Sequence, residues 1–207
     1  MKKILAAVIA VMMLVTSCAF AETASPAEPL KEGEMYFHGY INNAVGYYVG
    51  TPAEWALIGL NATQDNLTQA YEVMGFSDVS ALLDSLTEEN NILFAVSATG
   101  EQMVLTYGQS DGITVDRLAE EIGAFKAMLQ AAYTGIEFKE DSGIVSINEL
   151  TQVFYIGTKY KSQDVSQYFV PAGSNVYVFT FTNVEKDVEK AVVSSFRVDP
   201  ELIGQKN

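Results

Sequence analysis

The residues that could do acid–base or nucleophilic chemistry are few. The 207-residue chain contains one histidine, His38, and one cysteine, Cys18. A Ser-His-Asp hydrolase needs a histidine base beside a nucleophile, which many such enzymes present on a tight strand-to-helix turn. His38 instead lies between Phe37 and Gly39 in a predicted strand, where a half-exposed histidine without a catalytic role is expected. A single histidine also cannot supply the set of nitrogen ligands usual for zinc. We therefore expect no catalytic residue, no metal site and no cofactor.

Two pairs of adjacent carboxylates are the other candidates for catalysis. Glu88 with Glu89, and Glu120 with Glu121, could serve as the paired acids of a glycosidase. Both pairs fall on predicted helix faces opposite the apolar stripes, where neighbouring side chains diverge, so we interpret them as solvated charge. An envelope hydrolase that uses His38 or a carboxylate pair stays as an alternative hypothesis.

Aromatic side chains gather near the start of the predicted domain. Between residues 36 and 55 the chain carries Tyr36, Tyr40, Tyr47, Tyr48 and Trp55. Tyrosine and tryptophan favour contacts with partners, sugars and lipids. Tyr40, Tyr48 and Trp55 are therefore candidate binding residues. Cross-strand pairing within a sheet accounts for the same aromatic side chains, so this structural interpretation stands beside the functional one.

The first 21 residues form a predicted export signal. Lys2 and Lys3 precede an apolar run at 4–15, which is too short to span a bilayer. Residues 19–21 form a small-x-small cleavage site, whereas residues 15–18 resemble a bacterial lipobox, in which Cys18 would become the lipidated first residue. Both interpretations place the protein outside the cytoplasm, either secreted or anchored to the membrane through Cys18.

Composition limits the partners. The chain carries a formal net charge of −14, so its surface repels nucleic acid and anionic lipid and tends to attract cations or basic partners. After the signal, no segment approaches the ~18 uninterrupted apolar residues of a membrane-spanning helix. We expect the mature chain to have no transmembrane span and to bind an unidentified protein or small-molecule ligand.

Residue periodicity predicts one domain at 35–198, preceded by a flexible acidic leader at 22–34 and followed by a tail at 199–207. Two short strands with a turn at 42–43 open the domain. Further strands are predicted at 91–97, 102–109, 144–147, 152–160, 165–170 and 176–182. Helices are predicted at 67–74 and 79–86, at 115–132 after a Thr114 cap, and at 184–195 after an Asn183 cap. This order predicts an α+β protein, a three-layer α/β/α sandwich with a mostly antiparallel sheet of about six or seven strands.

Short motifs occur at both ends of the domain. Residues 40–47 read YINNAVGY, a Tyr-x-Asn-x-x-x-Gly-aromatic stretch, and lead to Pro52 and Trp55 in a Pro-x-x-Trp pattern. Residues 195–198 read SFRV, a Ser-Phe-Arg-aliphatic close. Together these motifs resemble those of the PsbP/Mog-like superfamily. The resemblance implies an α/β/α sandwich without enzymatic activity, in a bacterial exported or lipoprotein-type member of the superfamily.

The leading functional hypothesis is therefore an exported, non-catalytic binding or accessory module of a bacterial cell envelope. A carrier of a small apolar ligand, bound between sheet and helix layers, is an alternative from another class. Such a carrier needs an apolar cavity of ~300 Å³ or more beneath the long helix.

Overall fold

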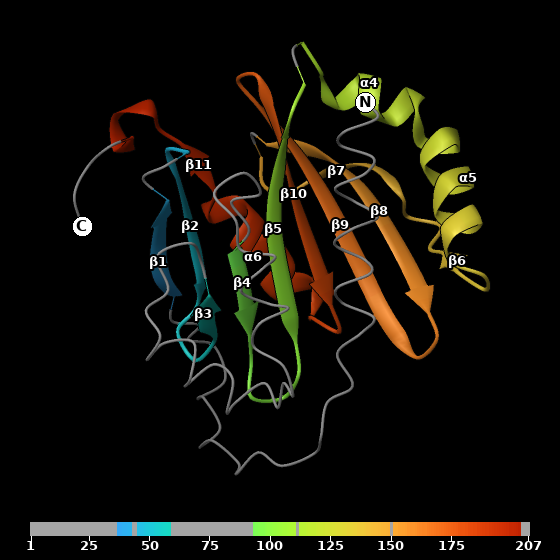
Figure 1. Ribbon diagram of the computed structural model, residues 1–207, viewed down its shortest axis with the longest axis horizontal. Coiled ribbons are helices and arrows are strands. Elements are labelled where there is room, and N and C mark those ends of the chain that lie inside the picture. Colours follow the sequence, from blue (N-terminus) through green and yellow to red (C-terminus); the bar gives the residue numbers. More distant parts are fainter. Residues whose placement is uncertain (1–36, 43–44, 59–92, 111, 150, 204–207) are drawn as a thin grey trace.

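The computed structural model describes residues 37–42, 45–58, 93–110, 112–149 and 151–203 (Figure 1). The export signal with Cys18, the leader at 22–34, Tyr36, the helices predicted at 67–74 and 79–86, and the Glu88–Glu89 pair lie outside these residues.

Most of the described chain forms an antiparallel sheet of eight strands. Its order is β3-β4-β5-β10-β9-β8-β6, and β7 also pairs with β8. The strands are β3 (Ala56–Ile58), β4 (Leu93–Val96), β5 (Gln102–Gln109), β6 (Glu137–Phe138), β7 (Gly143–Ser146), β8 (Gln152–Tyr160), β9 (Gln163–Ala172) and β10 (Asn175–Thr182). The predicted α+β class with a mostly antiparallel sheet is confirmed. Strands β3 and β6 were not predicted, because two or three residues are too few to establish an alternating pattern.

A second sheet of three strands lies beside the first. It consists of β1 (Phe37–Asn42), β2 (Tyr47–Pro52) and β11 (Arg197–Val198), in the order β1-β2-β11. The sequence predicted one sheet of about six or seven strands; the main sheet has eight strands, and these three form a separate sheet. The alternation identified β1 and β2 as strands, but it carries no information on which distant segment completes their sheet. Gly46, with a φ of 75°, closes the β1–β2 connection and donates its N–H to the carbonyl of Asn42 at 2.8 Å.

The helix predicted at 115–132 is two helices, α4 (Val115–Glu120) and α5 (Ile122–Ala132). Thr114 caps α4 as predicted, because its Oγ1 accepts a hydrogen bond from the N–H of Arg117 at 3.3 Å. The break falls at Glu121, which has a ψ of 4° and is both the C-cap of α4 and the N-cap of α5. Figure 1 shows α4 and α5 running in different directions at the edge of the large sheet.

The last helix, α6 (Lys186–Ser195), begins later than predicted, and its cap is Glu185 rather than Asn183. Asn183 has a positive φ of 56°, a conformation that asparagine tolerates better than most residues. Its side-chain oxygen accepts a hydrogen bond from the N–H of Asp164 at 3.1 Å, so Asn183 joins the start of β9 to the end of β10.

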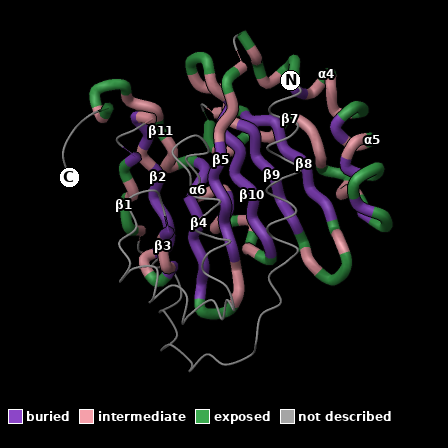
Figure 2. Tube along the Cα trace, viewed as in Figure 1, coloured by how far each residue is buried: buried purple, intermediate pink, exposed green. Residues whose placement is uncertain are grey.

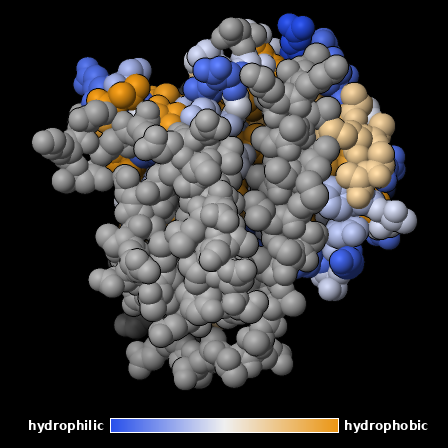
Figure 3. Space-filling model, viewed as in Figure 1, coloured by the Kyte–Doolittle hydropathy of each residue, from blue (hydrophilic) through white to orange (hydrophobic). Residues whose placement is uncertain are grey.

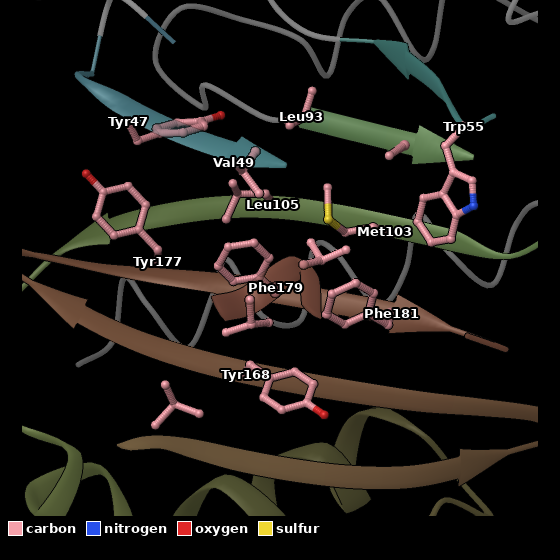
Figure 4. Packing of buried hydrophobic residues seen from close by; sticks show 14 of the residues in the cluster. Tyr47, Val49, Trp55, Leu93, Met103, Leu105, Tyr168, Tyr177, Phe179 and Phe181 are labelled. Carbon is pink, nitrogen blue, oxygen red and sulfur yellow. The ribbon is translucent and has the colours of Figure 1, made fainter. Parts of the chain in front are cut away.

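Two apolar cores lie on opposite faces of the large sheet (Figure 2). One core contains Tyr177, Phe179 and Phe181 of β10, packed with α6 and the three-stranded sheet (Figure 4). The other contains Val176 and Val178 of the same strand, packed with α4 and α5. The prediction that both faces of this strand are covered is confirmed. Helices therefore pack on both faces of the sheet.

Hydrophobic and hydrophilic side chains both reach the surface of the described residues. Figure 3 shows hydrophobic residues near β11 and the short 3-10 helix η1 (Pro200–Leu202), and a hydrophobic group with hydrophilic residues around it at the edge where α4 and α5 lie. Within the tail expected at 199–207, the backbone N–H of Asp199 donates to the carbonyl of Gly46 at 2.8 Å. No helix in the described ranges is long and apolar enough to cross a membrane.

Candidate functional site

A polar pocket of about 320 Å³ lies beside the first turn of α6. It is lined by Lys139, Asp164, Ser166, Asn183, Val184, Glu185, Lys186 and Glu189. These residues come from the segment after β6, from β9, from the end of β10 and from α6. Segments far apart in the sequence therefore bring charged groups of both signs to one place.

Strand register explains why the sheet contributes polar groups here. Tyr155 of β8 lies opposite Tyr168 of β9, and Gly157 lies opposite Ser166. Alternate residues of a strand share a face, so all four positions face α6. Gly157 is required because a Cβ there would overlap the Tyr155 hydroxyl. The hydroxyls of Tyr155 and Ser166 lie 3.4 Å apart beneath the pocket.

Glu189 is a buried carboxylate, only 3% exposed. The Tyr168 hydroxyl donates a hydrogen bond of 2.7 Å to its Oε2, and the Lys186 ammonium lies 3.5 Å from the same oxygen. A buried carboxylate needs such partners, because it has lost its hydration. Burial, and then the negative charge and hydrogen bond of Glu189, raise the pKa of Tyr168 far above its ordinary value. The phenol therefore remains a hydrogen-bond donor at every physiological pH.

The Lys186 ammonium also contacts two aromatic rings. Its Nζ lies 3.5 Å from the centroid of the Tyr155 ring and 5.3 Å from that of Tyr168. The two rings are 5.0 Å apart, so they pack directly against each other. Tyr155, Tyr168 and Glu189 thus surround one ammonium group with aromatic faces and a carboxylate. We call these three residues the ammonium cage.

A second ion pair lies at the pocket rim. Lys139 Nζ is 2.9 Å from Asp164 Oδ1, and both side chains are partly exposed. Burial by itself would lower the pKa of Lys139, but the hydrogen bond and the charge of Asp164 together outweigh it and raise that pKa. Lys139 is therefore held in its charged form.

The structure does not bring the candidate binding residues Tyr40, Tyr48 and Trp55 into one site. Tyr40 is half-buried with its ring 6.1 Å from that of Tyr47, and burial raises its pKa. Tyr48 points to the opposite face of β2, where the Arg197 guanidinium lies 4.5 Å from its ring. Trp55 is 5% exposed and belongs to the core. A binding role for these residues stays a prediction, with Trp55 the least accessible of them.

Among the described residues considered for catalysis, His38 lies on a different element from the Glu120–Glu121 pair. His38 is exposed on β1, Glu120 is exposed at the end of α4, and Glu121 lies at the break between α4 and α5. Within the described ranges, no group of three or more His, Cys, Asp or Glu side chains is placed to bind a metal ion.

The space beneath the long helical segment is occupied by aromatic side chains. Phe125 of α5 lies with its ring 5.5 Å from that of Phe169 and 5.9 Å from that of Phe154. Leu129, on the same face of α5, is fully buried. These side chains occupy part of the space in which the apolar-ligand carrier would need its cavity, and that alternative stays a prediction.

Sequence patterns did not single out Tyr155, Tyr168 and Glu189. One signal for Glu189 was available, because it lies three and four residues before Val192 and Val193 and so shares their helix face. All three side chains are buried. A charged residue on the apolar face of an amphipathic helix indicates a buried polar partner. The two tyrosines are indistinguishable from ordinary core residues until the register of β8 and β9 is known.

No protein-family model matches the sequence, and no curated protein matches it either. Solved structures do. Cyanobacterial PsbP (CyanoP) from Synechocystis sp. PCC 6803 has a TM-score of 0.45 and 12% identity, over 86% of this chain and all of that one. LpqN of Mycobacterium tuberculosis, described as involved in cell envelope biogenesis, has a TM-score of 0.43 and 9% identity, over 82% of this chain and 94% of that one.

Proposed function

We propose that this protein is an exported, non-catalytic binding or accessory module of a bacterial cell envelope, with a three-layer sandwich of the PsbP/Mog-like kind. The predicted export signal at 1–21 supports the location. The pocket beside α6 supports the binding role, because it combines a solvent-facing hollow with charged groups of both signs. The partner is an unidentified protein or small molecule that contacts this pocket.

The pairing of the charged groups is the observation that carries the non-catalytic part of the proposal. Lys139 is paired with Asp164, while Glu189 is paired with Lys186 and Tyr168. General acids and bases have pKa values tuned toward the working pH. In this pocket the pKa values of Lys139 and Tyr168 are both raised, which moves them further from neutrality. Groups in this state suit recognition better than proton transfer.

Crosslinking in intact cells of the source bacterium tests the proposal. The full chain, its Glu189→Gln variant and a Lys190→Ala control would be crosslinked, purified and compared, and mass analysis of the mature N-terminus would report export and any lipid on Cys18. Lys190 is half-buried on the same helix but does not line the pocket. We expect an envelope component that is captured by the parent and by the control and is lost with Glu189→Gln. Turnover of an envelope substrate that vanished on a point substitution in this domain would contradict the proposal.

A further inference from the structure

One cation in the pocket is bound by contacts that a free ligand could also make. The Lys186 ammonium lies over the Tyr155 ring at 3.5 Å, near the Tyr168 ring at 5.3 Å, and 3.5 Å from Glu189 Oε2. Aromatic faces combined with a negative group are the chemistry by which proteins recognise alkylammonium ions. The cage therefore has the features of an ammonium-binding site whose occupant is a residue of the same chain.

Lys186 is a weakly bound occupant. Its side chain is 40% exposed, and a lysine loses several rotatable bonds when its ammonium is fixed. It is the first residue of α6, where the positive end of the helix dipole disfavours a cation. It also precedes Glu189 by three residues, and a lysine placed before its glutamate is the less favourable order on a helix. Contacts with the cage, rather than the preferences of the helix, therefore account for the position of the ammonium.

The cage itself is fixed by packing. Tyr155 and Tyr168 are fully buried, and the Tyr168 hydroxyl orients Glu189 through their hydrogen bond. Without a cation the buried carboxylate would lack a counter-charge, which is costly. The cage therefore requires a cation but does not specify that it must belong to Lys186.

The surroundings offer a route for exchange. Lys186 and Glu189 both line the pocket of about 320 Å³, so a ligand in the pocket reaches the cage directly. Glu185 adds negative charge to the same lining, in which Asp164 is paired with Lys139. The net charge of −14 also raises the local concentration of cations around the protein.

We propose that the pocket binds a small ligand with a primary alkylammonium group, which takes the place of the Lys186 ammonium in the cage while the Lys186 side chain moves into solvent. The inference rests on the proposed function, since it names the ligand class of the same pocket. The alkyl part of the ligand occupies the pocket, and its ammonium lies between the Tyr155 ring and Glu189.

Titration with n-butylammonium tests this inference, and n-butanol serves as the uncharged match. Backbone amide shifts of the full chain would locate binding and calorimetry would measure its strength. A ligand this small should bind the parent with a dissociation constant of roughly 1 mM. Lys186→Ala removes the internal competitor, so binding should tighten about tenfold. Glu189→Gln removes the counter-charge, so binding should weaken about tenfold. Lys190→Ala should match the parent, and butanol should not bind.

Several results would overturn the inference. Shifts spread over the acidic surface, equal binding by the Glu189→Gln variant, or no tightening in Lys186→Ala would each exclude the cage as the site. If circular dichroism shows that Glu189→Gln does not fold, Glu189→Asp takes its place. This variant keeps the charge but moves it away from the Tyr155 ring, so butylammonium binding should weaken about tenfold as well. If butylammonium does not bind, but crosslinking in cells still captures an envelope component with the parent and loses it with Glu189→Gln, only the ligand class is rejected. If crosslinking captures the same components with the parent and with Glu189→Gln, the proposed function is rejected.

Discussion

Replacing Tyr168 with phenylalanine isolates the hydrogen bond on which the pocket depends. The substitution removes one oxygen atom and leaves the ring in place between Tyr155 and Phe181, at centroid distances of 5.0 and 5.8 Å. The lost bond is the 2.7 Å contact with the carboxylate of Glu189. Since Glu189 is only 3% exposed, water cannot readily replace the hydroxyl.

The expected cost follows from the charge of the acceptor. Hydrogen bonds to charged groups contribute about 1.5–3 kcal/mol, whereas neutral ones contribute about 1 kcal/mol. After the substitution, Glu189 keeps only the longer 3.5 Å contact with Lys186 among its described partners. We therefore expect Tyr168→Phe to lower the free energy of unfolding by about 2 kcal/mol at neutral pH. For a domain of this size the midpoint of thermal unfolding should fall by roughly 4–8 °C.

Tyr155→Phe is the matched control. Among the described residues, its hydroxyl makes one neutral contact, of 3.4 Å with Ser166, so the loss should be about 0.5 kcal/mol or less. Urea unfolding of both variants, followed by tryptophan fluorescence of Trp55, gives the two values. A double-mutant cycle with Glu189→Gln should show a coupling of about 1 kcal/mol between residues 168 and 189. Equal losses in Tyr168→Phe and Tyr155→Phe would refute the argument that Tyr168 stabilises a buried charge.

Three further predictions concern the elements around the pocket. Phe125→Ala removes the ring that contacts Phe154 and Phe169. In a denaturant titration it should lower the free energy of unfolding by about 3–5 kcal/mol. A loss below about 1 kcal/mol would contradict the packing of α5 against the sheet. Gly46→Ala adds a Cβ 2.8 Å from the Ile203 side chain, at a φ of 75°. Gly100→Ala is the control, because Gly100 has a φ of 89° but open space around it. In the same assay Gly46→Ala should lower the free energy of unfolding by about 1–3 kcal/mol more than Gly100→Ala does. Lys139→Met should cost under about 0.5 kcal/mol near neutral pH, because both partners of the ion pair are partly exposed. Since the folded-state pKa of Lys139 is raised, the contribution of the ion pair to stability is fully present below the ordinary lysine pKa and is lost as the pH rises through the folded-state pKa. The parent and Lys139→Met should therefore have the same free energy of unfolding at strongly alkaline pH.

Local pattern determined most of the elements of this fold. The alternation in β10 predicted a strand apolar on both faces, and its two sets of side chains do belong to different cores. Thr114 was predicted as a cap and has that role. These features depend on neighbouring residues along the chain, so a short window of sequence contains the information that decides them.

Tertiary structure alone decided how those elements are combined. The second partner of β2 is β11, about 150 residues later in the chain. The break at Glu121 divides a stripe that looks continuous in the sequence. The candidate site is of the same kind, because Tyr155 and Tyr168 meet through strand register and Glu189 reaches them only when α6 docks. Such contacts depend on which arrangement buries the most apolar surface for the whole chain, a quantity that no local pattern contains. Sequence therefore determined the class, most of the strands and the expectation of an exported, acidic domain, while docking of α6 on the sheet created the pocket.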